Sequence, residues 1–184
     1  MRRDTIVRIT SMTEPIRAAA TKTLLVLRHA KSSWNDSALD DHARPLNKRG
    51  RRDGSRMGRL VREHRLTPDI IMSSDAVRSR RTAEAVAKAA RYAGEILLDR
   101  RLYIASPPGI FAVLRTVRET KAGTVMIVGH NPGLEELVTQ LTGEQQDLPT
   151  AALAQIGLPI GRWRNLTVST RGTLLGLWRP KELT

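Results

Sequence analysis

The sequence predicts an α/β sandwich built around a largely parallel sheet. Short apolar runs alternate along the chain with segments of helical periodicity, the pattern typical of this class. The chain has 184 residues, 40% of them hydrophobic, which suffices for one core, and no internal repeat or linker divides it. Strands are expected at residues 23–27, 69–72, 96–98, 124–128, 152–156 and 173–178.

The first predicted helix follows Asn47, a residue suited to cap a helix, and continues to about His64. It contains Gly50, Gly54 and Gly58 at intervals of four. Glycines weaken a helix, but at this spacing they share a face and let a second backbone pack closely.

Three further helices are expected at residues 76–92, 107–117 and 133–141. The second of them starts at Pro107-Pro108, and proline suits the first turn of a helix. The third has Glu135 and Glu136 near its start, where carboxylates complement the positive end of the helix dipole.

The charge balance favours an anionic partner. Lys and Arg number 31 against 18 Asp and Glu, which gives a formal net charge of +13 and a pI near 11.3. Many of the cations fall in one stretch, at Arg49, Arg51, Arg52, Arg56, Arg59, Arg62 and Arg65. Aromatic residues make up only 3% of the chain, so stacking platforms for nucleic acid are scarce. We therefore interpret the stretch as a solvated face rather than a nucleic-acid interface.

Cysteine is absent, which excludes disulfides, thiolate zinc sites and a cysteine nucleophile, and which suits a cytoplasmic location. The apolar runs are far shorter than the ~20 residues that span a bilayer, so no membrane association is expected. Residues 1–21 lack the apolar centre of a secretory signal. We expect them to form a disordered extension of a single domain over residues 22–184, or to reflect a mis-assigned start with Met12 as the alternative.

Two of the four histidines follow predicted strands directly. Arg28 and His29 come after the apolar run 24–27, and His130 comes after the run 124–129. The carboxyl ends of parallel strands form one edge of a sheet, where ligand crevices lie. A guanidinium grips phosphate through paired donors, and a neutral imidazole is a competent nucleophile.

A third strand end adds another cation. The run 69–72 leads into a helix whose first turns carry Arg78, Arg80 and Arg81. A helix N-terminus favours phosphate through its free N–H groups and its dipole.

These motifs resemble those of the histidine phosphatase superfamily. Residues 28–35, R-H-A-K-S-S-W-N, resemble the family's R-H-G-E-S-x-W-N, and residues 74–84 resemble its S-x-x-x-R-A-x-x-T-A-E segment. Residues 44–50 match the L-[TN]-x-x-G helix start, and residues 129–132 supply the second histidine. The R-H-A-K-S-S-W form, the R-P-L-N-x-R-G segment and the small size are most similar to the SixA-type phosphohistidine phosphatases. The resemblance implies a three-layer α/β/α sandwich of the phosphoglycerate-mutase-like fold.

The resemblance also implies the roles of the site residues. His29 would be phosphorylated transiently, while Arg28, Arg78 and His130 clamp the transferred phosphoryl group. Ser32 and Asn35 match family positions near the phosphate. The implied substrate is phosphohistidine on a protein, and no cofactor is implied.

The usual proton donor is missing. Sugar-phosphate members of the superfamily carry a glutamate general acid at a position that looks like Arg100 here. An imidazole is a better leaving group than an alkoxide, so this gap favours a phosphoramidate over a phosphate ester. The remaining candidate donors are Asp36, Asp40, Asp41 and Asp99.

Metal dependence is not expected, because no histidine or carboxylate lies at short ligand spacing from His29 or His130 and the flanking arginines repel cations. Two alternatives stay open. The chain could act on a small-molecule phosphate ester, or it could be a non-catalytic module that binds phosphate or nucleic acid through its charge. The presence of a nucleophile beside both arginines argues against pure binding.

Overall fold

The computed structural model describes residues 22–118 and 121–183, and the predicted extension over residues 1–21 lies outside them. The strands are β1 (Lys22–Arg28), β2 (Ile70–Ser73), β3 (Ile96–Leu98), β4 (Thr124–Gly129), β5 (Leu153–Leu158) and β6 (Thr173–Trp178). The helices are α1 (Lys48–Glu63), α2 (Val77–Ala90), α3 (Pro107–Leu114) and α4 (Gly133–Thr142), with short 3-10 turns η1 (Asp41–Ala43), η2 (Arg100–Leu102) and η3 (Trp163–Asn165).

The strands form one sheet in the order β3-β2-β4-β1-β5-β6. Strands β1 to β4 run parallel, and β5 runs antiparallel to both of its neighbours. The sheet is therefore largely parallel, as predicted. In the register of β1 and β4, Arg28 lies opposite Gly129, so the two strands end side by side.

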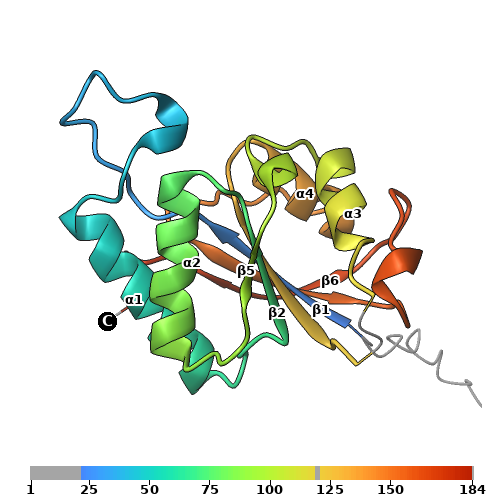
Figure 1. Cartoon of the computed structure of the whole chain (residues 1–184). Helices are drawn as coiled ribbons and strands as arrows, with labels where there is room; N and C mark the ends of the chain where they lie inside the picture. The colour runs from blue at the N-terminus through green and yellow to red at the C-terminus, as the bar shows by residue number, and fades with distance from the viewer. Residues whose placement is uncertain (1–21, 119–120, 184) are drawn as a thin grey trace, which may run out of the picture.

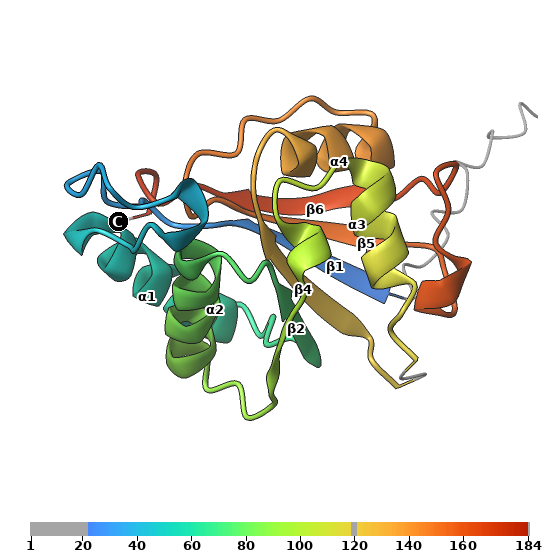
Figure 2. The same ribbon diagram turned by 45° about the horizontal axis from the view of Figure 1, so that its top comes forward.

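Helices cover both faces of the sheet and make a three-layer sandwich (Figures 1 and 2). Helices α1 and α2 lie on one face, and α3 and α4 lie on the other. Strand β1 serves both layers, because successive side chains of a strand point to opposite faces. Leu24 and Val26 belong to the core cluster shared with α3 and α4, whereas Leu25 and Leu27 belong to the cluster shared with α1 and α2. Each fully buried side chain of this kind contributes roughly 1.5–3 kcal/mol to stability.

The predicted elements are all present, with ends that differ by at most three residues. Asn47 caps α1 as expected, its side chain accepting a hydrogen bond of 2.8 Å from Gly50 N. Helix α3 ends at Leu114 rather than at Val117, because the amide and the hydroxyl of Thr116 both turn back to Val113 O. No helix among the described residues is long and apolar enough to cross a membrane.

The glycines of α1 bring that helix close to α2. A Cβ added at Gly58 would lie 2.6 Å from Val86 O and 2.7 Å from Ala89 Cβ, and one at Gly54 would lie 3.2 Å from Ala85 Cβ. The glycine spacing therefore serves close packing, as the sequence predicted.

We expect Gly58→Ala to lower the free energy of unfolding. Alanine gains up to about 1 kcal/mol of helix propensity, but the overpacking costs typically 1–3 kcal/mol and here meets backbone that cannot yield. Urea denaturation measures the difference. The matched control is Gly109→Ala in α3, where the added Cβ meets only Ala105 Cβ at 3.7 Å and stability should rise. Equal stabilisation by both substitutions would contradict the close approach.

Candidate active site

The site lies where three adjacent parallel strands end. Arg28 and His29 close β1, His130 follows β4, and Arg78 lies in the first turn of α2 after β2. Because β2, β4 and β1 are neighbours in the sheet, these side chains converge at one edge. All of them are buried or half-buried.

His29 presents an unprotonated nitrogen to this edge. Its side chain is 9% exposed, and its Nδ1 lies 2.8 Å from Ala30 O. A carbonyl oxygen only accepts hydrogen bonds, so Nδ1 carries the proton and Nε2 keeps its electron pair. Burial, together with the nearby Arg78 and Arg28, lowers the pKa of His29 to about 4, against the opposing effects of the Ala30 carbonyl and Asp41. At neutral pH the imidazole is therefore uncharged, with Nε2 located 3.3 Å from Arg78 Nε.

His130 takes the opposite tautomer. Its Nδ1 accepts a hydrogen bond of 3.2 Å from an Nη of Arg78, and its Nε2 lies 3.0 Å from Ser74 Oγ and 3.2 Å from Ser79 Oγ. Burial, together with the neighbouring His29 and Arg78, lowers the pKa of His130 to about 3. The two imidazole ring centroids are 4.9 Å apart.

Arg78 joins both histidines to a carboxylate. One Nη donates to Asp41 O, and the other donates to Asp41 Oδ2 at 2.7 Å. Asp41 also accepts hydrogen bonds from Tyr103 Oη at 2.8 Å and from Arg44 Nη1 at 2.9 Å. Burial alone would raise the pKa of Asp41, but the hydrogen bonds from Tyr103, Arg78 and Arg44 lower it to about 2. Asp41 is therefore ionised and occupies the anion-binding side of Arg78.

Arg28 has an unused donor. Its Nη1 donates to Leu148 O at 2.8 Å, whereas its buried Nε has no hydrogen-bond partner within residues 22–118 and 121–183. Unpaired buried donors are rare in proteins and call for an explanation, such as a ligand. The edge thus combines two guanidinium groups with a neutral imidazole, the set that a phosphoryl group requires.

Comparisons with known proteins agree with this chemistry. The family model described as "Histidine phosphatase superfamily (branch 1)" matches residues 24–103. A chloroplastic protein of Arabidopsis thaliana is 32% identical over 163 residues, which span 78% of this chain and 75% of the relative. The chain belongs to the histidine phosphatase superfamily.

Two solved structures of SixA-type members of the superfamily share the fold of this chain. A protein from Agrobacterium tumefaciens, named as a phosphohistidine phosphatase SixA, is 27% identical with a TM-score of 0.72, over 87% of this chain and 99% of that chain. A protein from Nakamurella, named in the same way, is 25% identical with a TM-score of 0.76, over 86% and 96%. The superfamily and these neighbours support phosphatase activity.

The other two predicted phosphate-binding residues lie farther from this cluster. Ser32 is buried, and its Oγ accepts a hydrogen bond of 2.8 Å from Arg44, which connects it to Asp41 and so to Arg78. Asn35 is exposed, and its side chain makes no hydrogen bond in the described part of the chain. Their roles as phosphate ligands stay predictions.

The residues that position Arg78 and its partners were missed. Thr82 Oγ1 donates to Arg78 O at 2.7 Å and accepts from Ala30 N at 2.9 Å, which ties the start of α2 to the residue after His29. Ser79 and Thr82 stand inside the family-like segment over residues 74–84, so the motif held a signal. Tyr103 gave none, because its contact with Asp41 joins residues 62 positions apart.

The candidate proton donors differ in whether they contact the cluster of His29, Arg78 and His130. Arg100, at the position of the family's glutamate, is 80% exposed, and Asp99 caps η2 and pairs with Arg101. Asp36 accepts a hydrogen bond from Ala38 N in an exposed loop. Among the described residues, Asp41 is the one candidate carboxylate that contacts the cluster, and its low pKa leaves it without a proton to give.

The described residues also contain no group of three or more His, Cys, Asp or Glu side chains placed to hold a metal ion. The two histidines have cationic guanidinium groups as neighbours.

We expect Asp41→Asn to bind inorganic phosphate about fivefold more tightly, because repulsion between two charges near 4 Å apart in water is ~1 kcal/mol. The amide keeps an acceptor for Arg78 and removes the charge. Isothermal titration calorimetry with phosphate measures the affinity. Asp40→Asn, the same charge change one residue away on an exposed side chain, should leave it unchanged. Weaker binding by Asp41→Asn would mean that holding Arg78 in place matters more for phosphate binding than the charge repulsion from Asp41.

We expect the free energy of unfolding to fall as the pH drops from 6.5 toward 4. The unfolded chain protonates His29 and His130 near their ordinary pKa of 6.5, whereas the folded chain protonates them only near 4 and 3. Each histidine then removes up to about 1.4 kcal/mol per pH unit. Urea denaturation at several pH values tests this. The fall in stability should be smaller in the double variant His29→Asn/His130→Asn. It should persist in the control His64→Asn, whose side chain is exposed. An unchanged fall in the double variant would be inconsistent with buried neutral imidazoles.

Proposed function

We propose that the protein hydrolyses phosphohistidine on a protein substrate through a phosphorylated His29 intermediate. The observation that carries the proposal is the neutral His29, whose unprotonated Nε2 faces Arg78 while its Nδ1–H is held by Ala30 O. This arrangement supplies a nucleophile and a phosphate-binding cation at one point.

In the first step, His29 Nε2 attacks the phosphorus atom. The new Nε2–P bond forms as the P–N bond of the substrate breaks, and the substrate imidazole leaves uncharged if its other nitrogen carries a proton. Arg28 and Arg78 neutralise the charge spread over the phosphoryl oxygens. A single preorganised donor of this kind is worth roughly 10²–10³ in rate.

In the second step, water attacks the phosphoryl group, the Nε2–P bond breaks, and inorganic phosphate leaves. The proton of the attacking water passes to phosphate or solvent. His130, with a pKa of about 3, is a weak base, so its proposed role is to orient the phosphoryl group together with Arg78. A loose transition state at phosphorus needs little help from a base.

The substrate preference rests on the proton donors. Asp41 is ionised and Arg100 is exposed, so an alkoxide leaving group would find no acid at the site. The imidazole of phosphohistidine leaves without one. The Agrobacterium neighbour is named for the same substrate. The two arginines take the place that a metal ion holds in many phosphoryl-transfer enzymes, so we also propose that no metal is required.

We expect the wild type to release phosphate from a phosphohistidine protein without added metal, in the presence of a chelator, and to act poorly on phosphoserine. His29→Ala should lose at least about 10³-fold in rate, since the nucleophile is removed. His64→Ala is the matched control and should retain full activity, because His64 is exposed. Equal activity of His29→Ala and the wild type would refute the nucleophile, and faster turnover of phosphoserine would favour a phosphate ester as substrate.

The intermediate can be trapped by rapid quenching. We expect one phosphoryl group on His29 that survives alkali and is lost in acid, as a phosphoramidate is, detected by mass spectrometry of the digested protein. In His130→Asn the amount of this intermediate should change, but the phosphoryl group should still be found on His29. A phosphate found on a serine instead would contradict the mechanism.

A further inference from the structure

A basic groove lies between α1 and the chain that follows β6. Its volume is about 420 Å³. The cations that line it are Arg49, Arg52, Arg56, Arg179 and Lys181, and the carboxylates are Asp53 and Glu182. Part of the arginine-rich stretch thus lines a concave surface rather than a simple solvated face.

The positive charge of the groove is only partly compensated. Asp53 is shared by Arg49 at 3.5 Å and Arg52 at 3.4 Å, and Glu182 lies 3.5 Å from Arg179. Arg56 donates to Pro180 O at 2.9 Å, and neither Arg56 nor Lys181 forms an ion pair with any residue that the structure describes. Five cations against two carboxylates leave an excess of three positive charges.

The groove adjoins the active site through one segment of chain, residues 148–151. On the site side, Leu148 O accepts from Arg28 and Ala151 N donates to His29 O at 3.1 Å. On the groove side, Thr150 Oγ1 accepts from Arg49 at 3.4 Å. One short segment of chain therefore contacts both the site and the lining of the groove.

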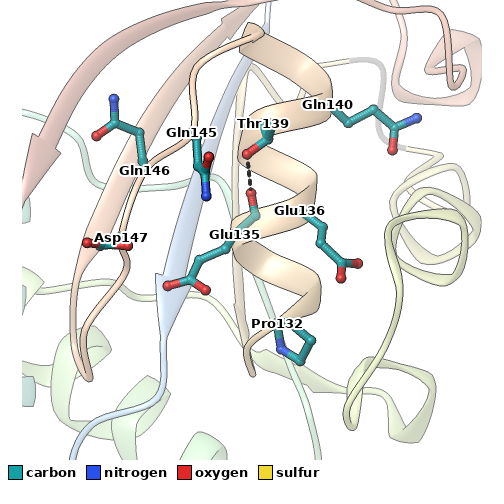
Figure 3. Close-up of a pocket in the computed structure, with 8 residues that line it drawn as sticks. All are labelled: Pro132, Glu135, Glu136, Thr139, Gln140, Gln145, Gln146 and Asp147. Atoms are coloured by element: carbon teal, nitrogen blue, oxygen red, sulfur yellow. Dashed lines mark hydrogen bonds between the residues drawn. The ribbon is translucent and has the colours of Figure 1, made fainter.

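A second hollow, which is acidic, adjoins the groove at Arg179, whose Nε donates to Asp147 O at 3.1 Å. Figure 3 shows Glu135 extending from α4 toward the loop that carries Asp147, whereas Glu136 projects from the other side of the helix. All three carboxylates line a hollow of about 440 Å³. Glu135 accepts a hydrogen bond of 2.8 Å from Leu148 N, so this hollow also borders the site. An acidic stretch of a bound protein is attracted to the groove and repelled from the hollow, so charge favours its placement on the groove side.

The lining of the groove favours carboxylates over nucleic acid. None of its described residues is aromatic, and single-stranded nucleic acid binds through base stacking as well as charge. Guanidinium forks match the geometry of carboxylates. We propose that the groove binds an acidic segment of the same protein whose phosphohistidine enters the site, an inference that rests on the proposed function.

Two phosphohistidine peptides test this. They share one length and one phosphohistidine, and a flanking stretch of four Asp and Glu in one is replaced by Asn and Gln in the other. We expect the wild type to show about fivefold higher kcat/KM for the acidic peptide at low salt, in keeping with a few exposed charge pairs. The preference should vanish near ~1 M salt, where the screening length is about 3 Å.

Arg52→Glu/Lys181→Glu should abolish the preference and keep the turnover of the neutral peptide, because both side chains are exposed and neither touches the histidines. The matched control is Arg162→Glu/Arg164→Glu, with the same change in charge near η3. That turn follows the end of β5, which pairs with the start of β1 and so lies at the far end of the sheet. The control should keep the preference.

The outcomes separate the groove from the proposed function. Equal kcat/KM for both peptides in the wild type would overturn the groove and leave the function standing. If neither peptide is hydrolysed, the proposed function fails, and fluorescence anisotropy of the two labelled peptides then tests whether the groove binds acidic segments. Tighter binding of the acidic peptide that is lost in Arg52→Glu/Lys181→Glu supports the groove. Equal binding of the two peptides overturns it. A single-stranded oligonucleotide that displaces the acidic peptide, and whose own binding is lost in that variant, would overturn it in favour of nucleic acid.

Discussion

The site depends on how the charge of Arg78 is held inside the protein. Its side chain is only 6% exposed, and a buried charge costs several kcal/mol unless it is paired and hydrogen-bonded. Here Asp41 supplies the paired charge, while His29 and His130 supply acceptors that need no charge. The charge of Arg78 is therefore compensated within the protein, and a phosphate bound by Arg78 would lie beside the ionised Asp41 carboxylate.

The rest of the fold keeps Arg78 in this position. The neighbouring ends of β2, β4 and β1 bring the two histidines to the start of α2, and Thr82 ties that helix to Ala30. Close packing of α2 against α1 at Gly58 fixes the helix on the sheet. Helix α1 also carries three arginines of the basic groove. One helix therefore packs against α2, which carries Arg78, and lines the groove beside the site.

The fold class and the meeting of His29, Arg78 and His130 could be predicted because each depends on a local pattern. An apolar run followed by a polar residue marks a strand end, and parallel strands bring such ends together. The direction of β5 was not predictable, since an apolar run records burial and not orientation. The contact of Asp41 with Arg78 was also hidden, because the loop before α1 folds over the sheet edge by contacts between residues 37 positions apart. Tyr103 reaches Asp41 in the same way.

The hydrogen bond from His29 to Ala30 O explains how the proposed reaction proceeds without a general acid. A neutral imidazole that keeps its Nδ1 proton becomes a cation when Nε2 bonds to phosphorus, and the carbonyl stabilises that cation. When the Nε2–P bond breaks, the same neutral tautomer returns, so His29 gains and loses no proton in either step. The substrate imidazole undergoes the reverse change: it is a cation while it is bonded to phosphorus and leaves as a neutral imidazole. Transfer between two imidazoles changes little in bond energy, which leaves the arginines to lower the barrier by stabilising the charge on the phosphoryl oxygens.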